Sequence, residues 1–355
     1  MLPKASRRSQ SKGQILALFA LSLTVILLAV GLVIDGGNAL VQRRSSQNAA
    51  DLAALAGARI VATWIDGDVA NGTDANVRAA IQSTAAANGA TVLFGTGPGN
   101  PHYVTDTGAN AGYVGTGTIP AGSVGVTVPT DRTFNPYFAA IIGASNWTAS
   151  ASATARGGYA VIEHYGNVFP VAVAEAFFET YPFCSGPVGS GPDCAPQALT
   201  PGHLNVPGGF GWLKFGAADK CTGFGLGMID DGCKSSKPFL QEQIGPPANS
   251  YGCCDVPTGG PAPVDRIGSL TGNKASADCS YYIDNEVVVT VPVFDSAGGT
   301  GANAWYHIVG FAGFQLTDCN GGKDIQGVWR KQIFLGPTSA TKTNDFASLA
   351  VQLVK

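Results

Sequence analysis

The stretch that decides the fold is residues 15–34, ILALFALSLTVILLAVGLVI, which holds no charge and is followed by Asp35. Twenty apolar or small residues in a helix rise by about 30 Å, which matches the hydrocarbon thickness of a bilayer. A helix also satisfies the backbone hydrogen bonds of a single segment in lipid. We therefore expect residues 15–34 to be a transmembrane helix that follows a basic tail of residues 1–14.

The charges around this span predict its orientation. Four basic residues precede the span and two follow it, close to Asp35; they are Lys4, Arg7, Arg8 and Lys12, and then Arg43 and Arg44. The more basic flank of a span stays in the cytoplasm. We therefore expect a cytoplasmic N-terminus and an extracytoplasmic C-terminal region.

A cleaved signal peptide and a buried core helix are the alternatives to an anchor. A signal peptide has a shorter apolar region with an A-x-A-like site after it, whereas the tripeptide Ala56-Gly57-Ala58 here lies far downstream. This spacing favours an uncleaved anchor.

All of the cysteines lie in the second half of the chain. An even number of cysteines in a translocated domain indicates disulfides, and the chain has no C-x-x-C pair of the kind that zinc ribbons use. We expect Cys184 to pair with Cys194 and Cys221 with Cys233. We expect Cys253 and Cys254 to pair with Cys279 and Cys319. These are all eight cysteines of the chain.

Composition restricts the class of partner and of fold. After residue 44 the chain carries 15 basic and 23 acidic groups, so we expect no nucleic-acid partner, which needs a basic face. The 48 Gly and 21 Pro residues indicate a turn-rich, β-inclined region with long loops. The expected class is α+β: a long N-terminal helix, a small α+β unit and a disulfide-rich, mainly antiparallel β ectodomain.

A second helical segment, residues 35–64, follows the span as a stalk. Gly36 and Gly37 either interrupt it weakly or leave one continuous helix of roughly 70 Å. Small and apolar residues recur at helical spacing and predict a packing face, which meets either the chain's own domain or a helix of another subunit. The residues of this face are Ala49, Leu52, Ala53, Ala56 and Ile60.

Residues 65–156 read as a membrane-proximal α+β unit, and Gly157-Gly158 marks the expected boundary to residues 157–355. In the first unit we expect helices over 74–88, with Thr73 or Asp74 as cap, and over 134–142. The strands expected there are 102–105, 123–129 and 147–155. In the second region the expected strands are 159–163, 168–174, 286–294, 305–316 and 327–335, and Pro292 predicts an edge strand or a bulge.

The N-terminal segment resembles a known family. Residues 13–35 (GQILALFALSLTVILLAVGLVID), then Arg43, then residues 47–58 (QNAADLAALAGA), are similar to the start of TadE/TadG-like proteins that assemble Flp, or tight-adherence, pili of bacteria. The resemblance implies a bacterial cell-membrane location and partners among other pilus-assembly or pilin subunits, contacted through the N-terminal helix. Membrane lipid and further copies of the chain are the other implied partners.

Two features of the family are absent from the sequence. Prepilin-peptidase substrates carry Glu five residues after the cleaved Gly, and Leu18 stands at that position counted from Gly13. The D-x-S-x-S start of a von Willebrand A metal site is also missing, because the third positions from Asp35 and Asp295 are Gly37 and Ala297.

The chain contains no motif of a common enzyme class. It has no H-E-x-x-H, no G-x-S-x-G and no P-loop, and its four histidines are scattered. Residues 318–324 favour an ordinary Asn-Gly hairpin over a calcium loop. We expect no catalysis, no cofactor and no metal.

The sequence therefore favours a structural or assembly component of the pilus, acting as scaffold, anchor or minor tip component. A pilin-like filament subunit is the first alternative. A membrane-tethered ectodomain with carbohydrate-binding or hydrolase activity is the second.

Overall fold

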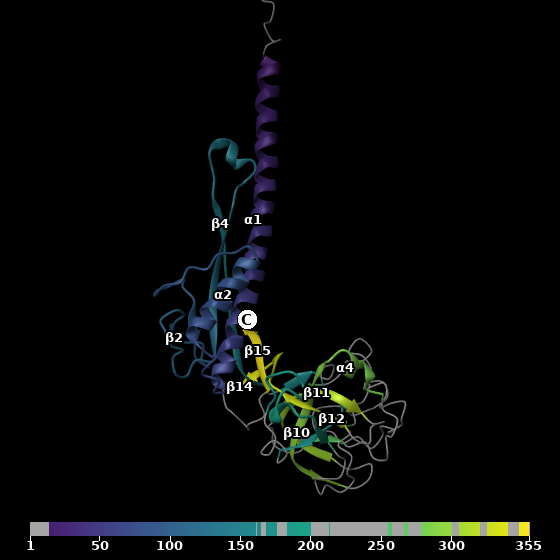
Figure 1. Cartoon of the computed structure of the whole chain (residues 1–355). Coiled ribbons are helices and arrows are strands. Elements are labelled where there is room, and N and C mark those ends of the chain that lie inside the picture. Colours follow the sequence, from purple (N-terminus) through teal and green to yellow (C-terminus); the bar gives the residue numbers. More distant parts are fainter. Residues whose placement is uncertain are drawn as a thin grey trace, which may run out of the picture.

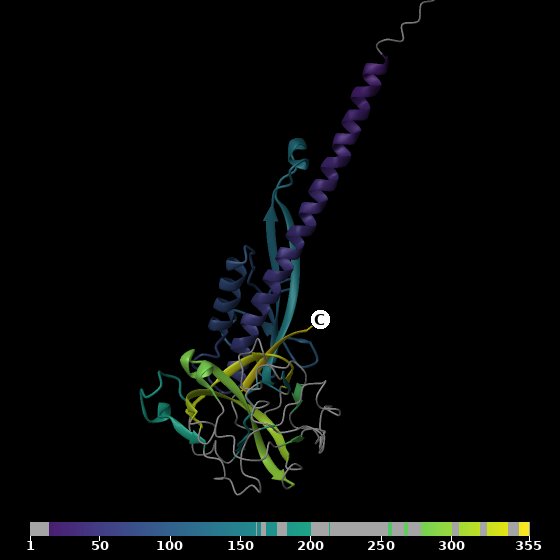
Figure 2. The same cartoon turned by 90° about the vertical axis from the view of Figure 1, so that its right-hand side faces the viewer.

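The computed structural model describes residues 14–160, 162–164, 168–175, 183–199, 213, 255–257, 266–268, 278–299, 305–319, 325–339 and 348–354. The chain forms a long rod, made by helix α1, with a membrane-proximal sheet along its lower half (Figure 1). A second sheet lies to one side of the lower end of α1 (Figures 1 and 2). The expected α+β class, with antiparallel pairing dominant, is confirmed.

Helix α1 runs unbroken over Gln14–Ile65, 52 residues, which is about 78 Å at the usual rise. Gly36 and Gly37 do not interrupt it, and a Cβ added at either would meet nothing within 4 Å. A Gly in a helix interior costs only about 1 kcal/mol relative to Ala, less than long flanking segments and tertiary packing supply. Span and stalk are therefore one continuous helix.

The membrane-proximal sheet has the strand order β13-β15-β4-β3-β1-β2, with β14 paired to β4. Its central pair is the long hairpin of β3, Gly125–Phe134, and β4, Trp147–Ala160. The outer strands are β1, His102–Val104, and β2, Asn110–Tyr113, on one side, and β13, Gln332–Leu335, β14, Thr338–Ser339, and β15, Ser348–Val354, on the other. The second half of α1 packs on this sheet and forms the main core with it.

Helix α2, Asp74–Ala87, packs on α1, and its start is capped as expected. The Thr73 hydroxyl accepts the Asn76 N–H, and Gly89 follows the helix with a φ of 69°. The buried Asp74 carboxylate accepts hydrogen bonds from the Tyr103 hydroxyl at 2.6 Å and from backbone N–H groups of residues 115 and 117. Burial raises the pKa of Tyr103 above its usual range, and the bond to Asp74 adds to the shift.

The second sheet has the order β6-β10-β11-β12-β7, with β9 paired to β11. Its long strands are β10, Val288–Gly298, β11, Trp305–Cys319, and β12, Ile325–Arg330. The short ones are β6, Val173–Ala174, β7, Gln197–Leu199, and β9, Arg266–Gly268; β5, Ile162–His164, and β8, Asp255–Pro257, form a separate pair. The β10–β11 register shifts after Val293 and after Phe294, so the expected irregularity lies close to Pro292.

One expected strand is wrong. Residues 327–335 form two strands rather than one, because the chain leaves β12 of the second sheet at Lys331 and enters β13 of the first sheet. The Lys331 ammonium lies 2.7 Å from the Asp66 carboxylate just after α1. This ion pair sits at the crossing between the two sheets.

The chain crosses between the two regions more often than a single boundary implies. The expected boundary, Gly157-Gly158, lies inside β4, and both glycines are in close contact with backbone atoms of other segments. The last strand, β15, returns to the first sheet and lies between β13 and β4. The membrane-proximal sheet thus contains strands from both of the regions that the sequence suggested.

The structure places two disulfides among the described residues. Cys184 bonds Cys194, as expected, on either side of a loop that includes the short helix η4, Pro192–Cys194. Cys279 bonds Cys319, so the expected pairing of these two with Cys253 and Cys254 is wrong. The reason is geometric: α4, Ser280–Asp284, packs on β11 and brings Cys279 to the end of that strand. Residues 221, 233, 253 and 254 lie outside the described residues.

Candidate membrane and assembly interface

The first half of α1 exposes its apolar side chains. Large aliphatic residues between Ile15 and Ile34 stand free of the rest of the protein, and only 6% of the most apolar 18-residue window is buried. Among the described residues, one helix is both long enough and apolar enough to cross a membrane, and that helix is α1. Its exposure and position indicate a single-pass membrane anchor followed by a C-terminal region.

The tip of the β3–β4 hairpin lies against this helix where the apolar run ends. The tip, residues 134–147, contains the short helix η1, Ala139–Ile142, which ends at Gly143 with a φ of 88°. Figures 1 and 2 show the hairpin running beside α1, with its tip at the upper half of the helix. The contact between α1 and η1 brings together residues about a hundred positions apart.

Asp35 fastens the tip to α1. Its Oδ1 accepts the N–H groups of Tyr137 at 2.6 Å and Phe138 at 3.1 Å, and its Oδ2 accepts those of Phe138 at 3.1 Å and Ala139 at 2.7 Å. These are N–H groups that the start of a short helix leaves without an internal acceptor. The carboxylate is 2% exposed, and bonds to an ionised acceptor are stronger than neutral ones. Asp35 is therefore a fixed structural link between the membrane helix and the hairpin.

Gly31 provides the space for this contact. It lies one turn before Asp35 on the same face of α1, and a Cβ there would be 2.8 Å from Cβ and Cγ of Phe138. Real Cβ atoms do not approach other carbons so closely, so the Phe138 ring requires a residue without a side chain at this position.

Below this point the buried face of α1 consists of small residues. Of the residues predicted to pack, Ala49 and Ala53 are fully buried against the chain's own core, Ala56 and Ile60 are partly buried, and Leu52 is exposed. The buried stripe also includes residues that the prediction missed: Ser46, Ala50, Ala54, Gly57, Ala58, Val61 and Ala62. The Thr130 hydroxyl of β3 donates to the Ser46 carbonyl at 3.0 Å and so links the stripe to the sheet.

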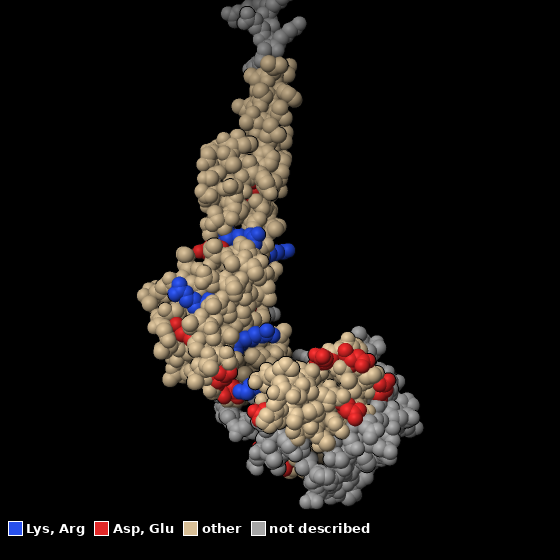
Figure 3. Space-filling view, viewed as in Figure 1, with Lys and Arg blue, Asp and Glu red and all other residues tan. Residues whose placement is uncertain are grey.

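Among the described residues, the apolar part of α1 and the tip of the hairpin carry almost no charge. Asp35 is the one charged residue between positions 15 and 42, and positions 133–155 of the hairpin have none. The visible face in Figure 3 shows no Lys or Arg on the outer part of the rod, and the first basic side chains appear below the hairpin tip. The exposed Arg43 and Arg44 of α1 follow the span at this lower level.

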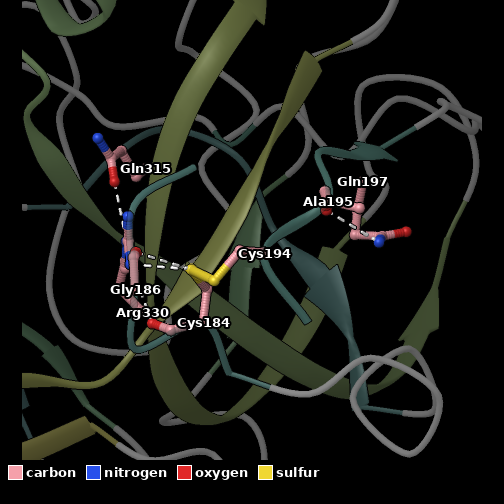
Figure 4. Close-up of a disulfide and its surroundings, with 7 residues drawn as sticks. All are labelled: Cys184, Gly186, Cys194, Ala195, Gln197, Gln315 and Arg330. Carbon is pink, nitrogen blue, oxygen red and sulfur yellow. Dashed lines mark hydrogen bonds between the residues drawn. A yellow bond between two sulfur atoms is a disulfide. The ribbon is translucent and has the colours of Figure 1, made fainter. Parts of the chain in front are cut away.

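The loop from Cys184 to Cys194 is closed by a disulfide and is bound to the second sheet by Arg330 of β12 (Figure 4). The Arg330 guanidinium donates to the Cys184 carbonyl at 3.0 Å, to the Gly186 carbonyl and, through Nε, to Gln315 Oε1 at 2.8 Å. The Cys184 N–H donates to the Trp329 carbonyl at 2.9 Å. The Cys184–Cys194 loop is therefore fixed on β12, which is an interaction that the sequence did not suggest.

The histidines do not form a shared site among the described residues. His307 Nδ1 lies 2.6 Å from Asp295 Oδ1, and His102 lies in the other sheet. Burial raises the pKa of Asp295, but hydrogen bonds with His307 and Ser296 outweigh it, so the net pKa lies below the usual value. No group of three or more His, Cys, Asp or Glu in the described ranges is placed to hold a metal ion. Most of the 318–324 turn lies outside those ranges.

Comparison with known proteins gives a match for the N-terminal segment. The chain matches no curated protein and no solved structure. Residues 13–59, which are the apolar span, Asp35 and most of the small-residue stripe, match the family described as putative Flp pilus-assembly TadE/G-like, and this segment of the chain is similar to that family.

Proposed function

We propose that this protein is a membrane-anchored structural component of a bacterial Flp-type pilus system, acting as scaffold, anchor or minor tip component. The observation that carries the proposal is the coincidence of the family match with α1: the matched residues 13–59 lie within or next to the helix that is both apolar enough to span a membrane and built into the core. Its partners would be pilus-assembly or pilin subunits, further copies of the chain, and membrane lipid.

The proposed orientation places the N-terminus in the cytoplasm and residues after Asp35 outside. The basic residues before the span support this, as do the two disulfides, since disulfides persist in oxidising compartments. We propose no catalytic role, because the features that support the function are packing surfaces and a membrane helix.

A deletion strain tests this function. Loss of the gene should abolish or strongly reduce surface Flp filaments, counted by electron microscopy, and the full-length gene should restore them. Filaments of normal number and length in the deletion strain would contradict the assembly role. Abundant protein within sheared filaments would instead favour the pilin-like alternative.

A further inference from the structure

The hairpin tip exposes apolar side chains next to the membrane helix. Ile141 is 79% exposed, Ile142 is 81% exposed and Tyr137 is 66% exposed, although water is a poor environment for all three. Residues 134–147, FNPYFAAIIGASNW, contain no charged side chain. A cluster of exposed apolar side chains is a candidate interaction site.

The height of the tip along α1 indicates what covers this surface. Phe138 lies on Gly31, three residues inside the apolar run that ends at Ile34, so the contact lies about 5 Å to the lipid side of the end of the span. The exposed isoleucines follow Phe138 within one turn of η1. The exposed apolar side chains of the tip thus lie next in the chain to a contact that falls within the apolar run of α1.

The backbone of the tip is suited to a place with little water. Most of its N–H groups donate within the protein, either to Asp35 or to nearby oxygens; these are the groups of Tyr137, Phe138, Ala139, Ile141, Gly143, Ala144 and Asn146. An irregular segment enters the lipid boundary at low cost only when such groups are satisfied.

The neck of the tip carries the residue types of a membrane–water interface. Phe134 and Trp147 face each other at the hairpin's last paired position, with ring centroids 6.1 Å apart in an edge-to-face contact. Trp and Tyr are enriched at the headgroup level of membranes. The nearest charges of the hairpin, Asp131 and Arg132, lie further down β3.

We propose that the hairpin tip, residues 134–147, inserts into the headgroup–acyl boundary of the bilayer leaflet nearest Asp35, as a second membrane contact beside α1. The partner is lipid, and the Asp35 carboxylate fixes the depth of the tip. This inference rests on the membrane-anchoring part of the proposed function.

Fluorescence quenching in vesicles tests the inference. A small fluorescent amino acid replaces Ile142, Leu28 or Val69, one at a time, in the full chain reconstituted in phosphatidylethanolamine–phosphatidylglycerol vesicles. Leu28 lies within the span, and Val69 is exposed beyond the far end of α1, so they are the lipid and water controls. Lipids brominated on the acyl chain near the headgroup are one quencher, and iodide in the buffer is the other.

We expect bromolipid to quench position 142 to an extent comparable with position 28, and not position 69, and iodide to quench position 69 alone. Iodide quenching at position 142 that equals that at position 69 would overturn the inference. Protection of position 142 from both quenchers would also overturn it, because the tip would then be covered by protein. Failure of bromolipid to quench position 28 would contradict the anchor itself and so the proposed function.

Discussion

At the scale of single residues, Asp35 is the most specific feature of the molecule. Its carboxylate ends the apolar run and accepts N–H groups of Tyr137, Phe138 and Ala139. We predict that Asp35→Ala frees these groups and that their hydrogen exchange accelerates by at least about tenfold, because buried donors lose a charged acceptor. Asp51→Ala is the matched control, since Asp51 on the same helix bonds only to the nearby Gln47 in the described contacts. Equal exchange in both variants would contradict the role of Asp35.

Gly31 makes a second prediction at this scale. Gly31→Leu places a side chain where Phe138 lies, whereas Gly36→Leu meets open space. Both changes favour the helix by up to about 1 kcal/mol, so only the first should displace the hairpin tip. Chymotrypsin should therefore cleave after Tyr137 or Phe138 faster in detergent-solubilised Gly31→Leu than in Gly36→Leu or the wild type. Identical cleavage rates in the two variants would show that the close contact is unimportant.

At the scale of elements, the disulfides are predicted to contribute unequally. The Cys184–Cys194 bond closes a sequence separation of 10 and Cys279–Cys319 one of 40. By the chain-entropy relation, removing the first should cost about 2.7 kcal/mol and removing the second about 4 kcal/mol. Urea unfolding of the paired Cys→Ser variants, in detergent, measures both. A peptide map with Cys279 joined to residue 253 or 254 would contradict the observed connectivity.

Elements that depend on local signals could be predicted from the sequence, whereas those that depend on distant contacts could not. The uncharged run before Asp35 predicted the span, the Thr73 cap predicted α2, and a short separation predicted the Cys184–Cys194 bond. Nothing local indicates that β15 pairs with β4, because the partners Val351 and Gly157 are almost two hundred residues apart. The role of Asp35 was missed for the same reason, since its three donors lie about a hundred residues downstream.

The burial of the long helix illustrates a smaller error of the same kind. The spacing of Ala49, Leu52, Ala53, Ala56 and Ile60 correctly indicates a helix. The same spacing predicts a packing face whose centre is slightly shifted from the buried one. Alanines lie both on the predicted face and beside it, so the hydrophobicity of the residues does not distinguish buried from exposed positions. The structure instead buries the pairs Ala49–Ala50, Ala53–Ala54 and Gly57–Ala58 against the sheet.

At the scale of the whole molecule, β15 connects the last part of the chain to the membrane-proximal core. Val351 is fully buried in that core, and Leu353 on the same strand is partly exposed. We predict that Val351→Ser destabilises the protein by about 2–4 kcal/mol, because it removes buried methyl groups and buries a hydroxyl. Leu353→Ser, the control, should cost less than about 1 kcal/mol. Equal shifts of the thermal midpoint in detergent would contradict the position of β15 in the sheet.

Helix α1 forms a rod whose upper part is apolar, and the disulfide-bonded second sheet lies to one side of its lower end (Figures 1 and 3). Because α1 is both the membrane segment and part of the core, the anchor cannot leave the bilayer without moving the membrane-proximal sheet with it. This coupling supports the proposed role of an assembly component at the membrane.

The most direct test is mass spectrometry of the protein in washed membranes and, separately, in sheared surface filaments. The proposed function predicts intact protein in the membrane fraction, with residues before Gly13 retained, and at most traces in the filaments. Abundant protein in the filaments with Gln14 as its first residue would show a processed pilin and would contradict the account.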